Sequence, residues 1–115
     1  MITGMHVVVY AVRDMAAARR FYEAILDLAP DEFERDSYVE YTLPDGAAFA
    51  LGHDAKHPLF KCSGAVFGTD DLARATERAR EAGARIVERF DGPICRSVWC
   101  ADPDGNEFGI HQRTR

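Results

Sequence analysis

The chain has 115 residues, of which 47% are hydrophobic and 29% charged, a composition typical of one globular domain. Its 14 basic and 19 acidic residues give a net charge of −5, which argues against binding to the phosphate backbone of nucleic acids. No apolar run is long enough to span a bilayer and no signal-peptide pattern opens the chain, so we expect a cytoplasmic protein that does not enter membranes.

The first half of the chain predicts a strand, a helix and three short strands. The run HVVVYAV, which starts at His6, is rich in β-branched and aromatic residues and is typical of a buried strand. Asp14 is a candidate N-cap for a helix whose apolar residues recur every three or four positions from Met15 to Leu26. Strands are then expected around residues 32–35, 38–43 and 47–52, with a Pro-Asp-Gly turn between the last two.

The second half repeats this order. A strand is expected over residues 63–68, a helix over 72–82 that Asp71 precedes and Gly83 ends, and strands over 85–90, 95–101 and 106–112. The phrases PDGAAFAL and PDGNEFGI occupy corresponding places in the two halves. The chain is therefore predicted to be a single α+β domain over residues 1–115. It is built from two βαβββ modules, approximately 1–57 and 58–115, whose curved mixed sheet surrounds a central cleft that is the default ligand site.

Three stretches carry a resemblance to a known family. They are HVVVYAVRDMAAARRFYEAIL in the first module, and GTDDLARATERAREAGARIV with WCADPDGNEFGIHQ in the second. With these stretches the chain resembles the vicinal oxygen chelate superfamily, also called the glyoxalase/bleomycin resistance/dioxygenase superfamily. The resemblance implies its fold. It leaves the activity open, because the superfamily includes lyases, epimerases, ring-cleaving dioxygenases, thiol transferases and metal-free drug-sequestering proteins.

Metal-using members of that superfamily present His, Gln or Glu side chains at up to four positions, on the first and last strand of each module. The resemblance places these positions at Val7, Ala50, Gly64 and Gly109 of this chain. An alkyl group or a hydrogen has no lone pair, so none of the four side chains can coordinate a cation. We therefore expect no metal and no other cofactor.

His6 stands next to the first of these positions and is the obvious replacement ligand. Alternation along a strand sends it to the face opposite Val7, Val9 and Ala11, and we interpret it as a histidine at a strand edge. The alternative is a displaced metal set made of His6, Glu107 and His111.

The last strand of the second module offers candidate ligand-binding residues. Glu107, Gly109 and His111 share one face, while Phe108 and Ile110 face the helices. His111 could serve as a hydrogen-bonding or acid/base group of the site, and a contact at the cleft rim or in a dimer is the other interpretation.

On the preceding strand, Cys95, Ser97 and Trp99 are expected to face the cleft, with Val98 and Cys100 toward the helices. Trp99 would form an aromatic wall for a flat or apolar ligand, and a core tryptophan is the other interpretation. An odd count of three cysteines without metal-type spacing predicts reduced thiols, and we interpret Cys95 as unreactive.

In the first module, Tyr38 and Glu40 share a face opposite to the core candidates Val39, Tyr41 and Leu43. Glu40 could contact a cationic ligand or act as a base, and a solvated strand glutamate is the alternative. The small residues Ala50, Gly64 and Gly109 are expected to leave room for a ligand where relatives hold an ion.

These observations predict a metal-independent small-molecule-binding protein that sequesters an antibiotic or a metabolite, and the resemblance favours a homodimer. A second hypothesis is a metal-dependent glyoxalase-like lyase or dioxygenase with displaced ligands. A third is metal-free acid/base catalysis by Glu107 and His111.

Overall fold

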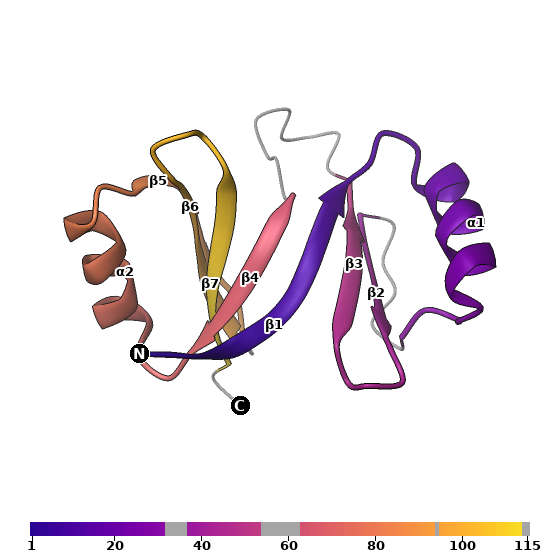
Figure 1. Cartoon of the computed structure of the whole chain (residues 1–115), viewed down its shortest axis with the longest axis horizontal. Coiled ribbons are helices and arrows are strands. Elements are labelled where there is room, and N and C mark those ends of the chain that lie inside the picture. Colours follow the sequence, from indigo (N-terminus) through magenta and orange to yellow (C-terminus); the bar gives the residue numbers. More distant parts are fainter. Residues whose placement is uncertain (32–36, 54–62, 94, 114–115) are drawn as a thin grey trace. The chain divides into compact units, whose positions relative to one another are not determined.

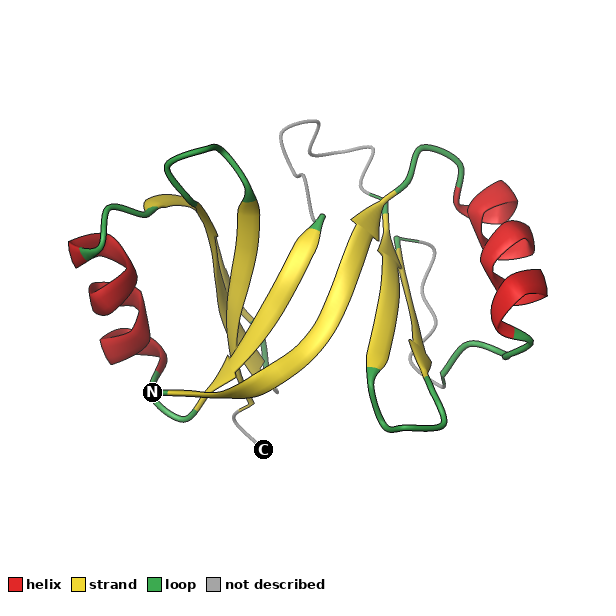
Figure 2. Ribbon diagram, in the orientation of Figure 1, coloured by secondary structure: helices red, strands yellow, loops and turns green. Residues whose placement is uncertain are grey.

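The computed structural model describes residues 1–31, 37–53, 63–93 and 95–113, and the elements in these ranges follow the predicted order (Figures 1 and 2). Their bounds are β1 Ile2–Ala11, α1 Met15–Leu26, β2 Tyr38–Thr42, β3 Ala48–Gly52, β4 Gly64–Thr69, α2 Leu72–Glu81, β5 Arg85–Asp91, β6 Cys95–Ala101 and β7 Glu107–Arg113. The strand expected at residues 32–35 lies outside the described residues. Neither described helix has the length and hydrophobicity needed to cross a bilayer.

The chain divides into two compact units, and β1 contributes to both. Unit 1 consists of Met1–His6 together with Gly64–Arg115, and unit 2 consists of Val7–Ser63. The strand order is β1-β4-β7-β6-β5 in unit 1 and β2-β3-β1 in unit 2. The start of β1 therefore belongs to the same unit as the second half of the chain.

Each half of the sequence pairs its first and last strands in parallel, β1 with β3 and β4 with β7, and the register is equivalent in the two pairs. In unit 2, Val9 on β1 lies opposite Ala50 on β3. In unit 1, Val66 on β4 lies opposite Gly109 on β7. The repeat in the sequence is therefore also a repeat of strand pairing.

The repeated Pro-Asp-Gly phrase forms the same turn twice. Gly46 and Gly105 both have a φ of +88°, a conformation that glycine adopts without steric cost. The Gly46 amide donates to the Leu43 carbonyl at 2.9 Å, and the Gly105 amide donates to the Asp102 carbonyl at 3.0 Å. The turn predicted before β3 is confirmed, and its second copy stands before β7.

Aspartate caps begin both helices, and the cap predicted at Asp14 is confirmed. The Asp14 carboxylate accepts a hydrogen bond from the Ala17 amide at 3.0 Å. The Asp71 carboxylate accepts one from the Arg74 amide at 3.1 Å. Each cap satisfies an amide that has no partner within its helix, which is worth about 1 kcal/mol.

In unit 1, α2 packs on one face of the sheet formed by β4, β7, β6 and β5 (Figure 1). The buried cluster between them contains Leu72, Ala75, Val98, Cys100 and Ile110. Phe108 packs against this cluster. The prediction that Val98, Cys100, Phe108 and Ile110 face the helix is confirmed, so the alternate residues of β6 and β7 lie on the other face.

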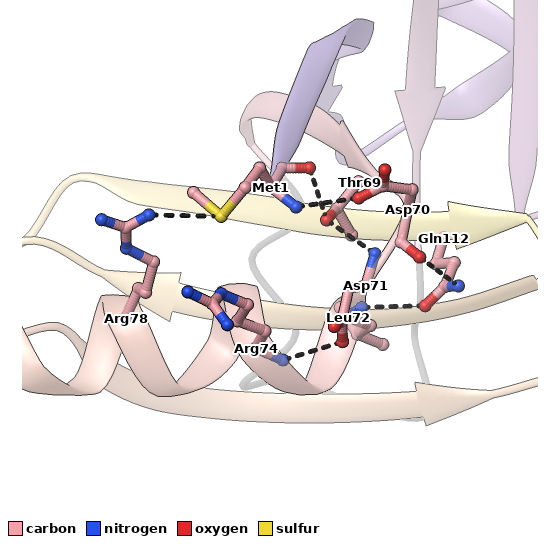
Figure 3. Close-up of polar contacts among 8 residues, drawn as sticks. All are labelled: Met1, Thr69, Asp70, Asp71, Leu72, Arg74, Arg78 and Gln112. Atoms are coloured by element: carbon pink, nitrogen blue, oxygen red, sulfur yellow. Dashed lines mark hydrogen bonds and ion pairs between the residues drawn. The ribbon is translucent and has the colours of Figure 1, made fainter.

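Met1, which precedes β1, is attached to the end of β4 and to the loop before α2 (Figure 3). The Met1 ammonium group lies 2.8 Å from the Asp70 carboxylate, and the Thr69 hydroxyl donates to the Met1 carbonyl at 2.8 Å. Gln112 of β7 joins the same region, since its side-chain oxygen accepts from the Leu72 amide at 2.8 Å. These contacts hold the start of β1 in unit 1.

In unit 2, α1 covers a cluster formed by Val39, Tyr41 and Leu51, which are completely buried. The Tyr41 hydroxyl donates to Glu23 on α1 at 2.8 Å, and Arg19 forms an ion pair with the same carboxylate oxygen at 2.7 Å. Core positions for Val39 and Tyr41 are therefore confirmed. Burial, followed by the hydrogen bond to Glu23, raises the pKa of Tyr41 to about 12.

This pKa predicts a loss of stability in alkali. An unfolded tyrosine ionises near pH 10, whereas folded Tyr41 keeps its proton, so the free energy of unfolding should fall between about pH 10 and about pH 12. Urea unfolding at several alkaline pH values measures the slope. The Tyr41→Phe variant, which has no phenol at this position, should show a shallower slope, and equal slopes in the two proteins would contradict the prediction.

Candidate functional site

Two histidines from opposite ends of the chain meet in unit 1. The Nδ1 atom of His6 on β1 lies 2.8 Å from the Nδ1 atom of His111 on β7. The two rings meet edge to face, with centroids 5.1 Å apart and planes at 79°. At this distance one nitrogen donates a hydrogen and the other offers its lone pair, so the rings share one N–H···N bond. We call His6 and His111 the imidazole pair.

A glycine in β4 makes this contact sterically feasible. Gly68 lies opposite His111 in the parallel pairing of β4 and β7. A Cβ atom at position 68 would overlap the imidazole ring of His6. Because Gly68 has none, the His6 ring lies against the backbone of β4 and reaches His111.

The alternation expected along β1 agrees with its burial, because Val7 and Val9 are buried and His6 is half-buried. Alternation along one strand does not, however, predict the contact between His6 and His111. The boundary between the two units falls between His6 and Val7. His6 therefore packs on the sheet of unit 1, beside Gly68 of β4 and His111 of β7.

The imidazole pair is half-buried, and its surroundings disfavour positive charge. Burial lowers the pKa of His111, and the nearby charges of His6 and Arg113 lower it further. The neutral form of His111 is therefore favoured. In a neutral pair, one bridging proton leaves one ring with a donor and the other with an acceptor at its remaining nitrogen.

Trp99 lies against Gly109 on the face of the unit 1 sheet that α2 does not cover. The two residues are partners in the antiparallel pairing of β6 and β7. The indole atoms Cε2 and Cζ2 are 3.3 Å from the point that a Cβ atom at position 109 would occupy, and Val66 Cγ2 is 3.4 Å from it. The indole therefore fills the space into which a side chain at position 109 would project.

Ser97 occupies the next pair along the same face. It lies opposite His111, as Trp99 lies opposite Gly109. Trp99, Ser97 and His111 are all half-buried. We call these three residues, together with His6, the candidate site.

The four positions at which the resemblance places metal ligands carry side chains that offer a cation no donor atom. Val7 and Ala50 are buried alkyl side chains of unit 2. In unit 1, Gly64 has a φ of +148°, and a Cβ atom there would overlap the carbonyl oxygen of Glu107. We expected Gly64 and Gly109 to leave room for a ligand. The space beside them instead holds the backbone of β7 and the indole of Trp99 respectively.

The displaced metal set is not assembled in the described part of the chain. Among the described residues, no group of three or more His, Cys, Asp or Glu side chains could hold a metal ion. The imidazole pair brings together two of the three expected ligands, and Glu107 is not grouped with them.

The first-module candidates lie in unit 2. The Tyr38 hydroxyl donates to the Glu40 carboxylate at 2.8 Å. Glu40 lies opposite Ala50 in the pairing of β2 and β3. Both alternate with the buried residues Val39 and Tyr41, so the predicted face of Tyr38 and Glu40 is confirmed.

Cys95 and Cys100 are free thiols. Cys95 is half-buried at the start of β6, opposite Arg113. Cys100 is buried in the cluster beneath α2, and burial raises the pKa of its thiol, which makes the reactive thiolate scarce. Cys62 lies outside the described residues.

Comparison with known proteins identifies the family. The family model described as the Glyoxalase/Bleomycin resistance protein/Dioxygenase superfamily matches residues 4–110. The chain belongs to this superfamily. None of the curated proteins matches the chain in sequence.

Solved structures show the same superfamily fold. Methylmalonyl-CoA epimerase from Mycobacterium tuberculosis has a TM-score of 0.74 at 18% identity, covering 99% of this chain and 90% of that one. A glyoxalase/bleomycin resistance protein/dioxygenase superfamily member from Vibrio splendidus 12B01 has a TM-score of 0.69 at 19% identity, covering 94% and 98%. A Legionella pneumophila protein described as an NAD-dependent benzaldehyde dehydrogenase has a TM-score of 0.73 at 17% identity, covering 94% and 98%. At such identities the likeness establishes the α+β fold of the superfamily.

Strand alternation predicts the face on which three members of the candidate site lie, but it does not predict the partner of the fourth. Ser97, Trp99 and His111 follow from alternation along β6 and β7. For His6 the sequence suggests a histidine at a strand edge, or a ligand in a displaced metal set with Glu107 and His111, and it does not predict a hydrogen bond between the two rings. A glycine inside a strand indicates a close approach by another group, so Gly68 is the signal that could have revealed it.

Proposed function

We propose that this chain is a metal-independent small-molecule-binding member of the superfamily. The observation that carries the proposal is the indole of Trp99 in the space of a side chain at position 109. An indole offers a flat apolar wall and one N–H donor, but no lone pair for a cation. Ser97 and the imidazole pair stand beside it and supply polar contacts to a bound molecule.

Sequestration of an antibiotic or an aromatic metabolite fits this arrangement better than a metal-dependent reaction. A lyase or dioxygenase of this superfamily would need a cation held by several side chains. Val7, Ala50, Gly64 and Gly109 supply no donor atom for one. The candidate site instead combines an aromatic surface with neutral hydrogen-bonding groups, which is the usual composition of a pocket for a small organic molecule.

Metal independence is tested by elemental analysis of the full chain purified without a polyhistidine tag. We expect Zn, Ni, Mn and Fe to be present well below one equivalent per chain. The His111→Gln variant serves as a comparison, because a metal held by the displaced set would be lost from it. A near-stoichiometric metal in the unaltered protein, depleted in the variant, would contradict the proposal.

Ligand binding is tested through Trp99, which is the only tryptophan in the chain and so gives a single indole N–H resonance. Titration with bleomycin, 2-naphthoate and 2-naphthamide should shift this resonance for at least one of the three compounds. Calorimetry should then show that Trp99→Leu weakens binding of that compound by about tenfold, through loss of the aromatic contact.

Phe21→Leu is the matched control for that substitution. Phe21 is 61% exposed on α1 and lies outside the candidate site, so its replacement should leave the affinity unchanged. An indole resonance that none of the three compounds moves, or equal losses in the two variants, would count against the proposed function.

The proposal includes two further expectations from the sequence. Association into a homodimer is measured by light scattering of the protein eluting from a sizing column. A cytoplasmic location is measured by fractionation of the cells that produce the protein.

A further inference from the structure

We propose that the imidazole pair and Arg113 bind the anionic group of a planar aromatic ligand whose ring lies against Trp99. This inference rests on the proposed function, because it names the chemical class of the ligand for the same site. An aromatic carboxylate or a phenolate would satisfy it.

The order of the residues along β6 and β7 supports this class. Three alternate residue pairs of β6 and β7 lie on one face of the sheet: Trp99 with Gly109, Ser97 with His111, and Cys95 with Arg113. Side chains on one face of a strand are about 7 Å apart. An aromatic ring on Trp99 therefore places a substituent on its edge beside Ser97 and His111, and Arg113 stands one step further.

The charges around the pair favour an anion at that position. Arg113 is exposed and is close enough to lower the pKa of His111 through its charge.

On β7, the acidic residue of this face is Glu107, at the opposite end of the strand. On β4, Val66 and Gly68 carry no charge, and on β6 the titratable group is Cys95. On β5, Glu88 lies opposite Trp99 and Phe90 lies opposite Ser97. An anionic ligand would therefore point away from Glu88 and Glu107, toward Arg113.

Binding of an anion would change the direction in which the surroundings of His111 shift its pKa. Burial and neighbouring positive charge lower its pKa in the free protein. A negative group beside the ring favours the imidazolium form, so the pKa rises in the complex. The protein should therefore take up protons when the ligand binds, and the affinity should fall as the pH rises through the range in which His111 of the complex loses its proton.

The test compares 2-naphthoate with 2-naphthamide, which has nearly the same shape and no charge. With the indole resonance of Trp99 as the reporter, the unaltered protein should bind 2-naphthoate about tenfold more tightly. His111→Gln and Arg113→Gln should each reduce this preference to about threefold or less. Arg96→Gln is the matched control, because Arg96 is an exposed arginine of β6 that alternates with Cys95 and Ser97 onto the other face.

The outcomes separate this inference from the proposed function. If neither compound moves the indole resonance, both proposals fall. If the two compounds bind equally well, the proposed function stands and the anion site is wrong. The anion site is also wrong if the preference survives in both His111→Gln and Arg113→Gln, or falls equally in Arg96→Gln.

Calorimetry of the unaltered protein in two buffers of different ionisation enthalpy gives a measurement that needs no variant. Proton uptake with 2-naphthoate supports the site, and its absence overturns it.

Discussion

Replacing Gly64 by alanine should destabilise the protein by about 3 kcal/mol, the largest effect that we expect from a single methyl group in this chain. Gly64 has a φ of +148°, which side-chain-bearing residues rarely adopt. A Cβ atom there would also overlap the carbonyl oxygen of Glu107, which is part of the backbone of β7. Relief requires β4 and β7 to separate at this point, because a backbone atom cannot rotate out of the way.

Urea unfolding of Gly64→Ala measures this cost, and Gly4→Ala is the matched control. Gly4 lies in β1, and a Cβ atom there would meet nothing within 4 Å. Its replacement should change the free energy of unfolding by less than about 0.5 kcal/mol. Similar values for the two variants would show that the close approach of β4 to β7 does not depend on Gly64.

Gly68→Ala should fold, yet it should separate the imidazole pair. A Cβ atom at position 68 would overlap the ring of His6. Unlike the Glu107 carbonyl that a Cβ atom at position 64 would meet, this ring belongs to a side chain and can rotate away. We expect a loss of about 1 kcal/mol, close to the value of one hydrogen bond. The pKa of His111 should move back toward its ordinary value, because the charge of His6 no longer acts on it.

Nitrogen-15 spectra of the histidine rings, recorded across a pH titration, measure both the separation of the pair and the pKa of His111. Gly4→Ala again serves as the control, since it alters the strand that carries His6 without touching the ring. An unchanged His111 titration in Gly68→Ala would show that His6 reaches its partner by another route. The Gly68→Ala variant should also lose the preference for 2-naphthoate over 2-naphthamide.

Much of the fold could be predicted because its local rules agree with one another. The aspartate caps, the Pro-Asp-Gly turns and the alternation along β2, β6 and β7 each depend on residues close together in the sequence. Trp99 and His111 were placed correctly by alternation alone. Such rules apply wherever a strand stays within one sheet.

The imidazole pair could not be predicted in this way, because it joins residues from opposite ends of the chain. Nothing local to His6 shows that β1 passes from one unit to the other after this residue. Likewise, the role of Gly64 depends on the carbonyl group of Glu107 in β7. The sequence shows that positions 64 and 68 hold glycine, and only the tertiary structure shows that the backbone of Glu107 and the ring of His6 lie where their side chains would project.

The equivalent pairing of first and last strands has a consequence for stoichiometry. The pair Gly68 and His111 in unit 1 corresponds to the pair Ala11 and Gly52 in unit 2. The first copy of the duplicated pattern thus has a hydrogen where the second has an imidazole. Within the described residues, the internal repeat therefore does not duplicate the histidine of the candidate site. On the proposed function, we expect calorimetry to give one molecule of ligand bound per chain.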